Sequence, residues 1–161
     1  MKVILIIWFC LTSSILLGQN FVLPKGEYMD TTRIFHSDCA PPYAIYYYQV
    51  KAKYPASSST LLREAREFLK HKHSSIEGSG YITFRFFVDC KGTMSRVQVL
   101  QTDENYNTTH FSKDYVNDLY LYVKTLDQWL VNTEIQNLKN INYIAFISFK
   151  IKHGQIVNII P

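Results

Sequence analysis

The chain has 161 residues, 47% of them hydrophobic and 19% charged, and carries a formal net charge of +4 at pH 7. This composition is typical of one globular domain with an ample core, and it excludes a disordered chain. The basic residues are dispersed along the sequence. A charge this small and this scattered does not indicate a nucleic-acid partner.

Residues 1–18 have the features of a secretory signal peptide. Lys2 precedes an apolar run from Val3 to Leu17, and the small residue Gly18 follows. The run is shorter than the roughly 20 residues that a membrane-spanning helix needs. We therefore predict that the leader is cleaved near Gly18, that the protein is exported, and that the mature chain does not span the membrane.

Cleavage of the leader would leave two cysteines, Cys39 and Cys90. In an oxidising compartment an even pair is most simply a disulfide. The bond would close a loop of about 50 residues and stabilise the fold by roughly 3 to 4 kcal/mol. A catalytic or metal-binding pair is disfavoured because the sequence contains no CxxC spacing.

Residues 19–53 are predicted to form an N-terminal extension, in which only Tyr43–Val50 has the composition of a strand. The tyrosines of this segment could form a surface that stacks on a ligand. A short strand or flap packed on the core is the favoured interpretation.

A first helix is predicted after Pro55, where serines at positions 57 to 59 can cap it. Its apolar residues share one face: Leu61, Leu62, Ala65, Phe68 and Leu69. His71 and His73 follow, with no local carboxylate or third histidine beside them. We interpret this pair as a solvated helix end rather than as metal ligands.

The most regular stretch of the sequence, Gly80–Gln101, predicts a β-hairpin. Every second residue of its first half is apolar, as expected for a strand buried on one face: Ile82, Phe84, Phe86 and Val88. Gly92 can supply the turn, and the uneven step from Met94 to Val97 indicates a β-bulge.

A polar loop and a second helix are predicted next. Asp103 and Glu104 are adjacent carboxylates, but nothing apolar surrounds them to raise a pKa, so an acid–base role is disfavoured. The helix is predicted from Phe111 or Lys113 to Val131, with Ser112 as its cap. We interpret its broad apolar stripe as core rather than as a cofactor site.

A second hairpin is predicted from alternation between Ile141 and Ile151, a turn at His153 and Gly154, and the closing segment QIVNII. The order is therefore helix, hairpin, helix, hairpin. This order predicts an α+β fold: a two-layer sandwich with two helices packed on one face of a mostly antiparallel sheet of about 3 to 4 strands.

Several of these segments together resemble the TonB C-terminal domain family. They are KYP at 53–55, GYITFRFFVDCKG at 80–92, the M-x-x-V-x-V pattern at 94–99, the segment Leu126–Trp129 and the closing IAFISFKI strand. The resemblance covers residues 54–161, which we take as a TonB C-terminal-like domain. The chain is similar to a divergent, stand-alone, exported member, because it carries neither a lasting membrane anchor nor a proline-rich spacer.

The resemblance implies a non-catalytic module that uses no cofactor and acts in the periplasm or outer envelope of a Gram-negative bacterium. Its partner would be a protein or peptide, such as a segment of an outer-membrane transporter, added to the sheet as an extra strand. The predicted binding edge lies on the last long strand, at Ile141, Tyr143, Ala145, Ile147, Phe149 and Ile151.

Other functions stay open. A pocket that gathers Tyr46, Tyr48, His110 and Asp103 would indicate a small-ligand binder or an enzyme, although no catalytic spacing supports one. A purely structural role would follow if Tyr43–Val50 covers the binding edge. The same edge could also pair two copies of the chain into a homodimer.

Overall fold

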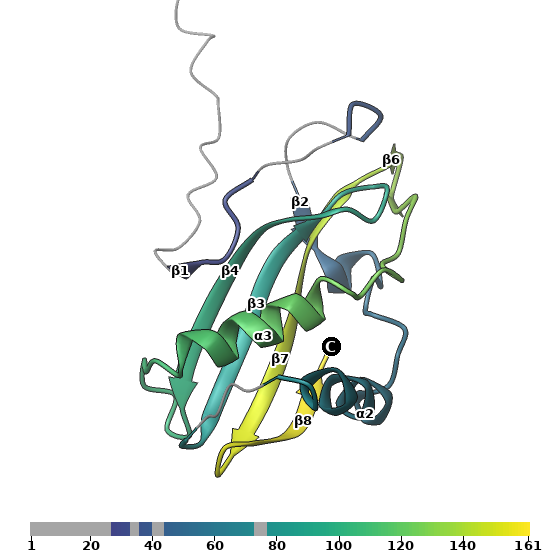
Figure 1. The fold of residues 1–161 in the computed structure, drawn as a ribbon. Coiled ribbons are helices and arrows are strands. Elements are labelled where there is room, and N and C mark those ends of the chain that lie inside the picture. The colour runs from purple at the N-terminus through teal and green to yellow at the C-terminus, as the bar shows by residue number, and fades with distance from the viewer. Residues whose placement is uncertain (1–26, 33–35, 40–43, 73–76) are drawn as a thin grey trace, which may run out of the picture.

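The computed structural model describes residues 27–32, 36–39, 44–72 and 77–161. The predicted leader, Tyr43 and His73 lie outside these residues. The described residues form an α+β fold with two helices and a six-stranded mixed sheet (Figure 1). None of the described helices is long and apolar enough to cross a membrane.

Both predicted hairpins are confirmed. The first joins β3 (Gly80–Val88) to β4 (Met94–Asp103) in antiparallel register, with the predicted bulge where β4 passes Arg96 at a φ of 50°. The second joins β7 (Asn142–Lys152) to β8 (Gln155–Ile160) through a turn in which Gly154 has a φ of 74°. These four strands are the long strands of the sheet.

The prediction of 3 to 4 strands is too low because the N-terminal extension adds two short strands. β1 (Glu27–Tyr28) pairs antiparallel with the outer side of β4, and β2 (Ala44–Tyr46) pairs parallel with β7. The order is β1-β4-β3-β7-β2, and β8 also pairs with β7. The sheet is mixed because of the single parallel pair between β2 and β7.

Helix α2 (Ser58–Leu69) lies where it was predicted. The Ser57 hydroxyl accepts a hydrogen bond from the Thr60 backbone amide at 3.1 Å, which satisfies one of the free donors in the first turn. Helix α3 (Lys113–Val123) begins as predicted. Ser112 stands at its N-cap but makes no side-chain capping bond.

The prediction that the second helix continues to Val131 is wrong, because α3 ends at Val123. The apolar pattern continues past that point because Leu126 and Trp129 are still buried, at 7% and 5% exposure. The Trp129 ring packs edge-on against Tyr54 and Phe86, with centroids 4.7 and 5.0 Å apart. A turn and a segment without regular secondary structure thus deliver these side chains to the core.

The core lies between the helices and one face of the sheet. Both helices lie in front of the sheet in Figure 1, and their residues Leu61, Ala65 and Leu119 belong to one buried cluster with the strands. The apolar residues of β3 that were predicted to share a face are all fully buried in it: Ile82, Phe84, Phe86 and Val88. A small separate hairpin, β5 (Glu134–Ile135) and β6 (Leu138–Lys139), was not predicted.

Candidate functional site

Strand β7 carries the predicted binding edge, but it is an internal strand. β3 pairs with it along its full length on one side, from Val88 opposite Tyr143 to Gly80 opposite Ile151. On the other side β2 takes Asn142–Ile144 and β8 takes Ser148–Lys152. The prediction of a free edge at β7 is therefore wrong, because β2 and β8 both pair with its second side.

Only three residues of β7, Ala145 to Ile147, have no strand opposite them on the second side. Two of them, Ala145 and Ile147, point into the core and are buried. The third, Phe146, packs edge-on against Tyr47 of the 3₁₀ helix η2 (Tyr47–Gln49), with ring centroids 5.1 Å apart. This short gap is too small and too crowded to accept another strand.

The outer side of β4 is largely covered by two segments. At one end β1 pairs with Gln98 and Val99, and the backbone oxygen of Thr32 accepts from the amide of Arg96 at 3.0 Å. At the other end the loop at 107–109 returns, and Thr109 donates its amide to the oxygen of Gln101 at 3.1 Å. Little of this edge is left for another chain.

The outer side of β8 differs, because no described strand pairs with it. Val157 and Ile160 are 39% and 43% exposed. Val157 has no partner on β7, since the register shifts between Ile156 and Asn158. Helix α2 reaches this strand through Arg66, whose Nη2 donates to the Ile156 oxygen at 2.7 Å. Among the four long strands that the structure describes, β8 is therefore the one whose outer side has no strand beside it, although α2 occupies its Ile156 oxygen.

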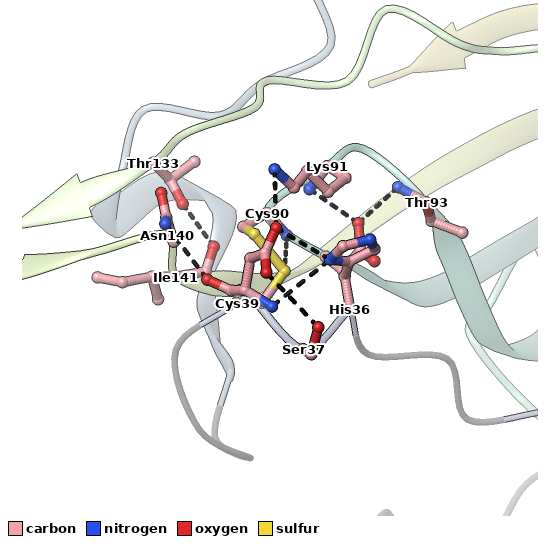
Figure 2. The surroundings of a disulfide bond; sticks show 11 residues. His36, Ser37, Cys39, Cys90, Lys91, Thr93, Thr133, Asn140 and Ile141 are labelled. Carbon is pink, nitrogen blue, oxygen red and sulfur yellow. Dashed lines mark hydrogen bonds and ion pairs between the residues drawn. A yellow bond between two sulfur atoms is a disulfide. The ribbon is translucent and has the colours of Figure 1, made fainter.

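A disulfide fastens the N-terminal extension to the end of β3. The Sγ atoms of Cys39 and Cys90 are 2.22 Å apart, so the predicted disulfide is present (Figure 2). Charged groups surround the bond: Asp38 lies 3.4 Å from His36 Nδ1 and 3.5 Å from Lys91 Nζ. The extension is thereby held close to the sheet between its two short strands.

The sheet face opposite the helices is the open face. Its β3 residues alternate with the core residues and are Tyr81, Thr83, Arg85 and Phe87. Phe87 lies at the disulfide end, where it is only 5% exposed. Tyr106, beside Tyr81 at the other end of β3, is 72% exposed, and Tyr48, in η2 directly after β2, is 62% exposed.

Aromatic and cationic side chains lie together at two places along this face. Tyr81 and Tyr106 stack with centroids 5.4 Å apart, and Lys150 Nζ lies 5.8 Å from the Tyr81 ring. Tyr46 and Tyr48 form a second stack at 5.5 Å, and the Arg85 guanidinium lies 6.0 Å from the Tyr46 ring. We call these six residues the aromatic–cation surface: Tyr46, Tyr48, Tyr81, Arg85, Tyr106 and Lys150.

Sequence reasoning missed this surface. The alternation predicted for this strand puts Ile82, Phe84 and Phe86 on the buried face, and it therefore puts Tyr81 and Arg85 together on the other face. Register was the missing information, because it sets Tyr81 opposite Lys150 and Arg85 opposite Phe146. The loop residue Tyr106 and the extension residue Tyr46 join them only through the tertiary fold.

The four residues that would have indicated a ligand pocket are not gathered. Tyr46 and Tyr48 lie on the aromatic–cation surface, and His110 Nε2 instead contacts Glu27 at 3.0 Å. The cavity of about 290 Å³ beside His110 is lined mainly by β1, β4 and the start of α3, and contains none of the other three residues. Hydrogen bonds from the Asn107 amide and side chain hold the pKa of Asp103 below its usual range.

Burial changes the ionisation of the core tyrosines. It raises the pKa of Tyr115 to about 12, and it also raises the pKa of Tyr122 and Tyr143. The hydroxyls of Tyr122 and Tyr143 donate to the backbone oxygens of Leu61 and Leu130, each at 3.1 Å. These bonds satisfy the buried hydroxyls in their neutral form.

Metal-ligating side chains do not cluster in the part of the chain that the structure describes: no group of three or more His, Cys, Asp or Glu residues could hold an ion there. No protein-family model matches this chain, and comparison with curated proteins and with solved structures gave no match either.

Proposed function

We propose that this protein is a non-catalytic interaction module of the bacterial cell envelope that binds an extended peptide along the outer side of β8. The exposed edge at Gln155–Ile160 carries the proposal, since an edge strand presents unpaired backbone groups that a peptide can pair with. The partner would be an envelope protein, such as an outer-membrane transporter. The resemblance to the TonB C-terminal domain supports this assignment to the envelope.

The proposed scaffold is a two-layer sandwich in which the sheet is backed by α2 and α3. Two features of β8 suit it to peptide binding. The bulge at Val157 and the exposed Ile160 side chain supply apolar contacts beside the backbone edge. Arg66 holds the strand from the side of α2 by bonding the Ile156 oxygen, so a peptide is expected to pair with the rest of the strand, which is fixed in place before the peptide arrives.

Selection of short random peptides against the full chain would test the proposal. Hydrogen exchange should then show that a selected peptide protects amides in Gln155–Ile160. Val157→Lys should abolish binding, because a lysine on an edge strand opposes pairing, whereas Leu138→Lys on β6 should leave it unchanged. Protection confined to another part of the protein, or binding that survives Val157→Lys, would refute the edge as the site.

A second candidate is a structural envelope component with a self-covered edge. It is favoured by β2, since Ala44–Tyr46 occupies part of the strand edge that the family resemblance assigns to the partner. Failure to select any peptide against the full chain would favour this function over the first.

A further inference from the structure

We propose that the aromatic–cation surface binds an acidic polysaccharide, a ligand separate from the peptide proposed for β8. The surface is a face of the sheet rather than an edge, and backbone pairing plays no part in it. The inference rests on the charge of the face, the spacing of its rings and the hydroxyls between them.

The charge of the open face is positive. Arg85, Arg96 and Lys150 each lie within 6.0 Å of a ring centroid on this side of the sheet. The sequences of β3, β7 and β8 contain no acidic residue, and β4 contains only Asp103, at its last position. That carboxylate accepts hydrogen bonds from the amides of Asn105 and Asn107 in its own loop. An anionic ligand therefore meets no opposing charge along the centre of the face.

The spacing of the rings fits a chain molecule. Tyr81 and Arg85 mark the two stacked tyrosine pairs and are four positions apart on β3, or roughly 13 Å along an extended strand. A ligand that touches both pairs must be extended and have flat apolar faces at intervals. Sugar rings offer such faces, which can stack on exposed tyrosine rings.

Hydroxyl groups lie between the two tyrosine pairs. Thr83 and Ser148 are opposite each other in register, and their Oγ atoms are 2.8 Å apart. Ser148 is only 9% exposed, so the half-buried Thr83 hydroxyl, which can both donate and accept, is the group placed to exchange hydrogen bonds with the hydroxyl rim of a sugar chain. A polysaccharide with carboxylates would use all three components of the surface: the rings, the hydroxyls and the cations.

Single-stranded nucleic acid fits less well. It carries one phosphate per nucleotide and is bound through extended basic grooves. Here the whole chain has a net charge of only +4, and the basic residues are dispersed. A sugar chain with carboxylates also presents a row of hydroxyls to the Thr83 side chain, which the backbone of single-stranded DNA does not.

Calorimetric titration of the full chain with hexagalacturonate would test the proposal. Two comparison ligands are cellohexaose, a neutral hexasaccharide, and hexathymidylate, a single-stranded nucleic acid. Hexagalacturonate should bind saturably, more tightly than either comparison ligand and more weakly as salt is added. Tyr106→Ala and Lys150→Ala should each lower the affinity about fivefold to tenfold. Leu138→Ala and Lys139→Ala, on the exposed β5–β6 hairpin, should leave it unchanged.

Equal binding of cellohexaose, tighter binding of hexathymidylate, or no saturable binding of hexagalacturonate would each overturn the proposal. Amide chemical shifts recorded on the same samples give a second readout. They should change around Tyr81, Arg85 and Lys150, and changes confined to β8 or the helices would also overturn it. Because the Tyr106 side chain is exposed, its variant is expected to fold, and the same spectra check that it does.

Discussion

The two faces of the sheet are made by the same strands but by different physical rules. In one rung Phe84 stands opposite Ile147, and both side chains are fully buried against the helices. In the next rung Thr83 stands opposite Ser148, and the two are joined by a hydrogen bond on the open face. The first rung stabilises the fold by excluding water, whereas the second pairs two polar side chains by a hydrogen bond on the face away from the helices.

The largest expected effect is on the buried face. Phe84→Ala should lower the free energy of unfolding by roughly 3 to 5 kcal/mol, because it removes a buried ring and leaves a cavity. Chemical denaturation of the two proteins measures the difference. A near-neutral result would mean that the two faces contribute alike and that the comparison is wrong.

Removal of the disulfide should have the next largest effect. Replacing Cys39 and Cys90 together by Ala should cost roughly 3 to 4 kcal/mol, since the unfolded chain regains the freedom of a long loop. Thermal unfolding with and without a reductant gives the comparison, and the reductant should have no effect on the double variant. Two free thiols in the unreduced, denatured wild-type protein would contradict the bond.

Alkaline pH should weaken the buried face selectively. The raised pKa of Tyr115, about 12, means that the folded protein keeps a proton that the unfolded chain releases near pH 10. The contribution of the neutral Tyr115 to the free energy of unfolding should therefore be fully present below pH 10. It should fall as the pH rises from 10 towards 12, and Tyr122 and Tyr143 should act in the same direction. Tyr115→Phe should reduce this loss when unfolding is followed against pH, and an unchanged slope would argue against its burial.

The smallest expected effect is on the open face. Ser148→Ala removes the hydrogen bond to Thr83 and should cost about 0.5 to 1.5 kcal/mol. Denaturation under the same conditions as for Phe84→Ala compares the loss of unfolding free energy in the two neighbouring rungs. A cost as large as that of Phe84→Ala would show that the open face is part of the core.

Periodic segments were predictable from the sequence, and contacts between distant segments were not. The alternation in β3, β4 and β7 and the stripe in α2 report burial directly, so these elements could be located. The same property caused the error at the end of α3: Leu126 and Trp129 follow the helical pattern because they are buried, although the chain there forms neither helix nor strand. Periodicity indicates which side chains are inside and only indirectly how the backbone brings them there.

The location of the free edge could not be predicted for a related reason. β2 has only three residues, and its parallel pairing with β7 is specified by packing rather than by a local turn. Ile45 adds to the core while Tyr46 lies on the open face, so one short segment serves both sides of the sheet. Nothing within Ala44–Tyr46 identifies its neighbour.

The pairing of β2 with β7 also has a consequence for the order of folding. Ala44 meets Asn142 about 100 positions later in the chain, so this contact must wait until almost the whole sequence has been made. The β3–β4 hairpin can close much earlier, because its strands are joined by a short turn. During that interval β2 and the side of β3 that β7 will cover have no strand partner, and a newly made chain is then most exposed to pairing with another copy of itself.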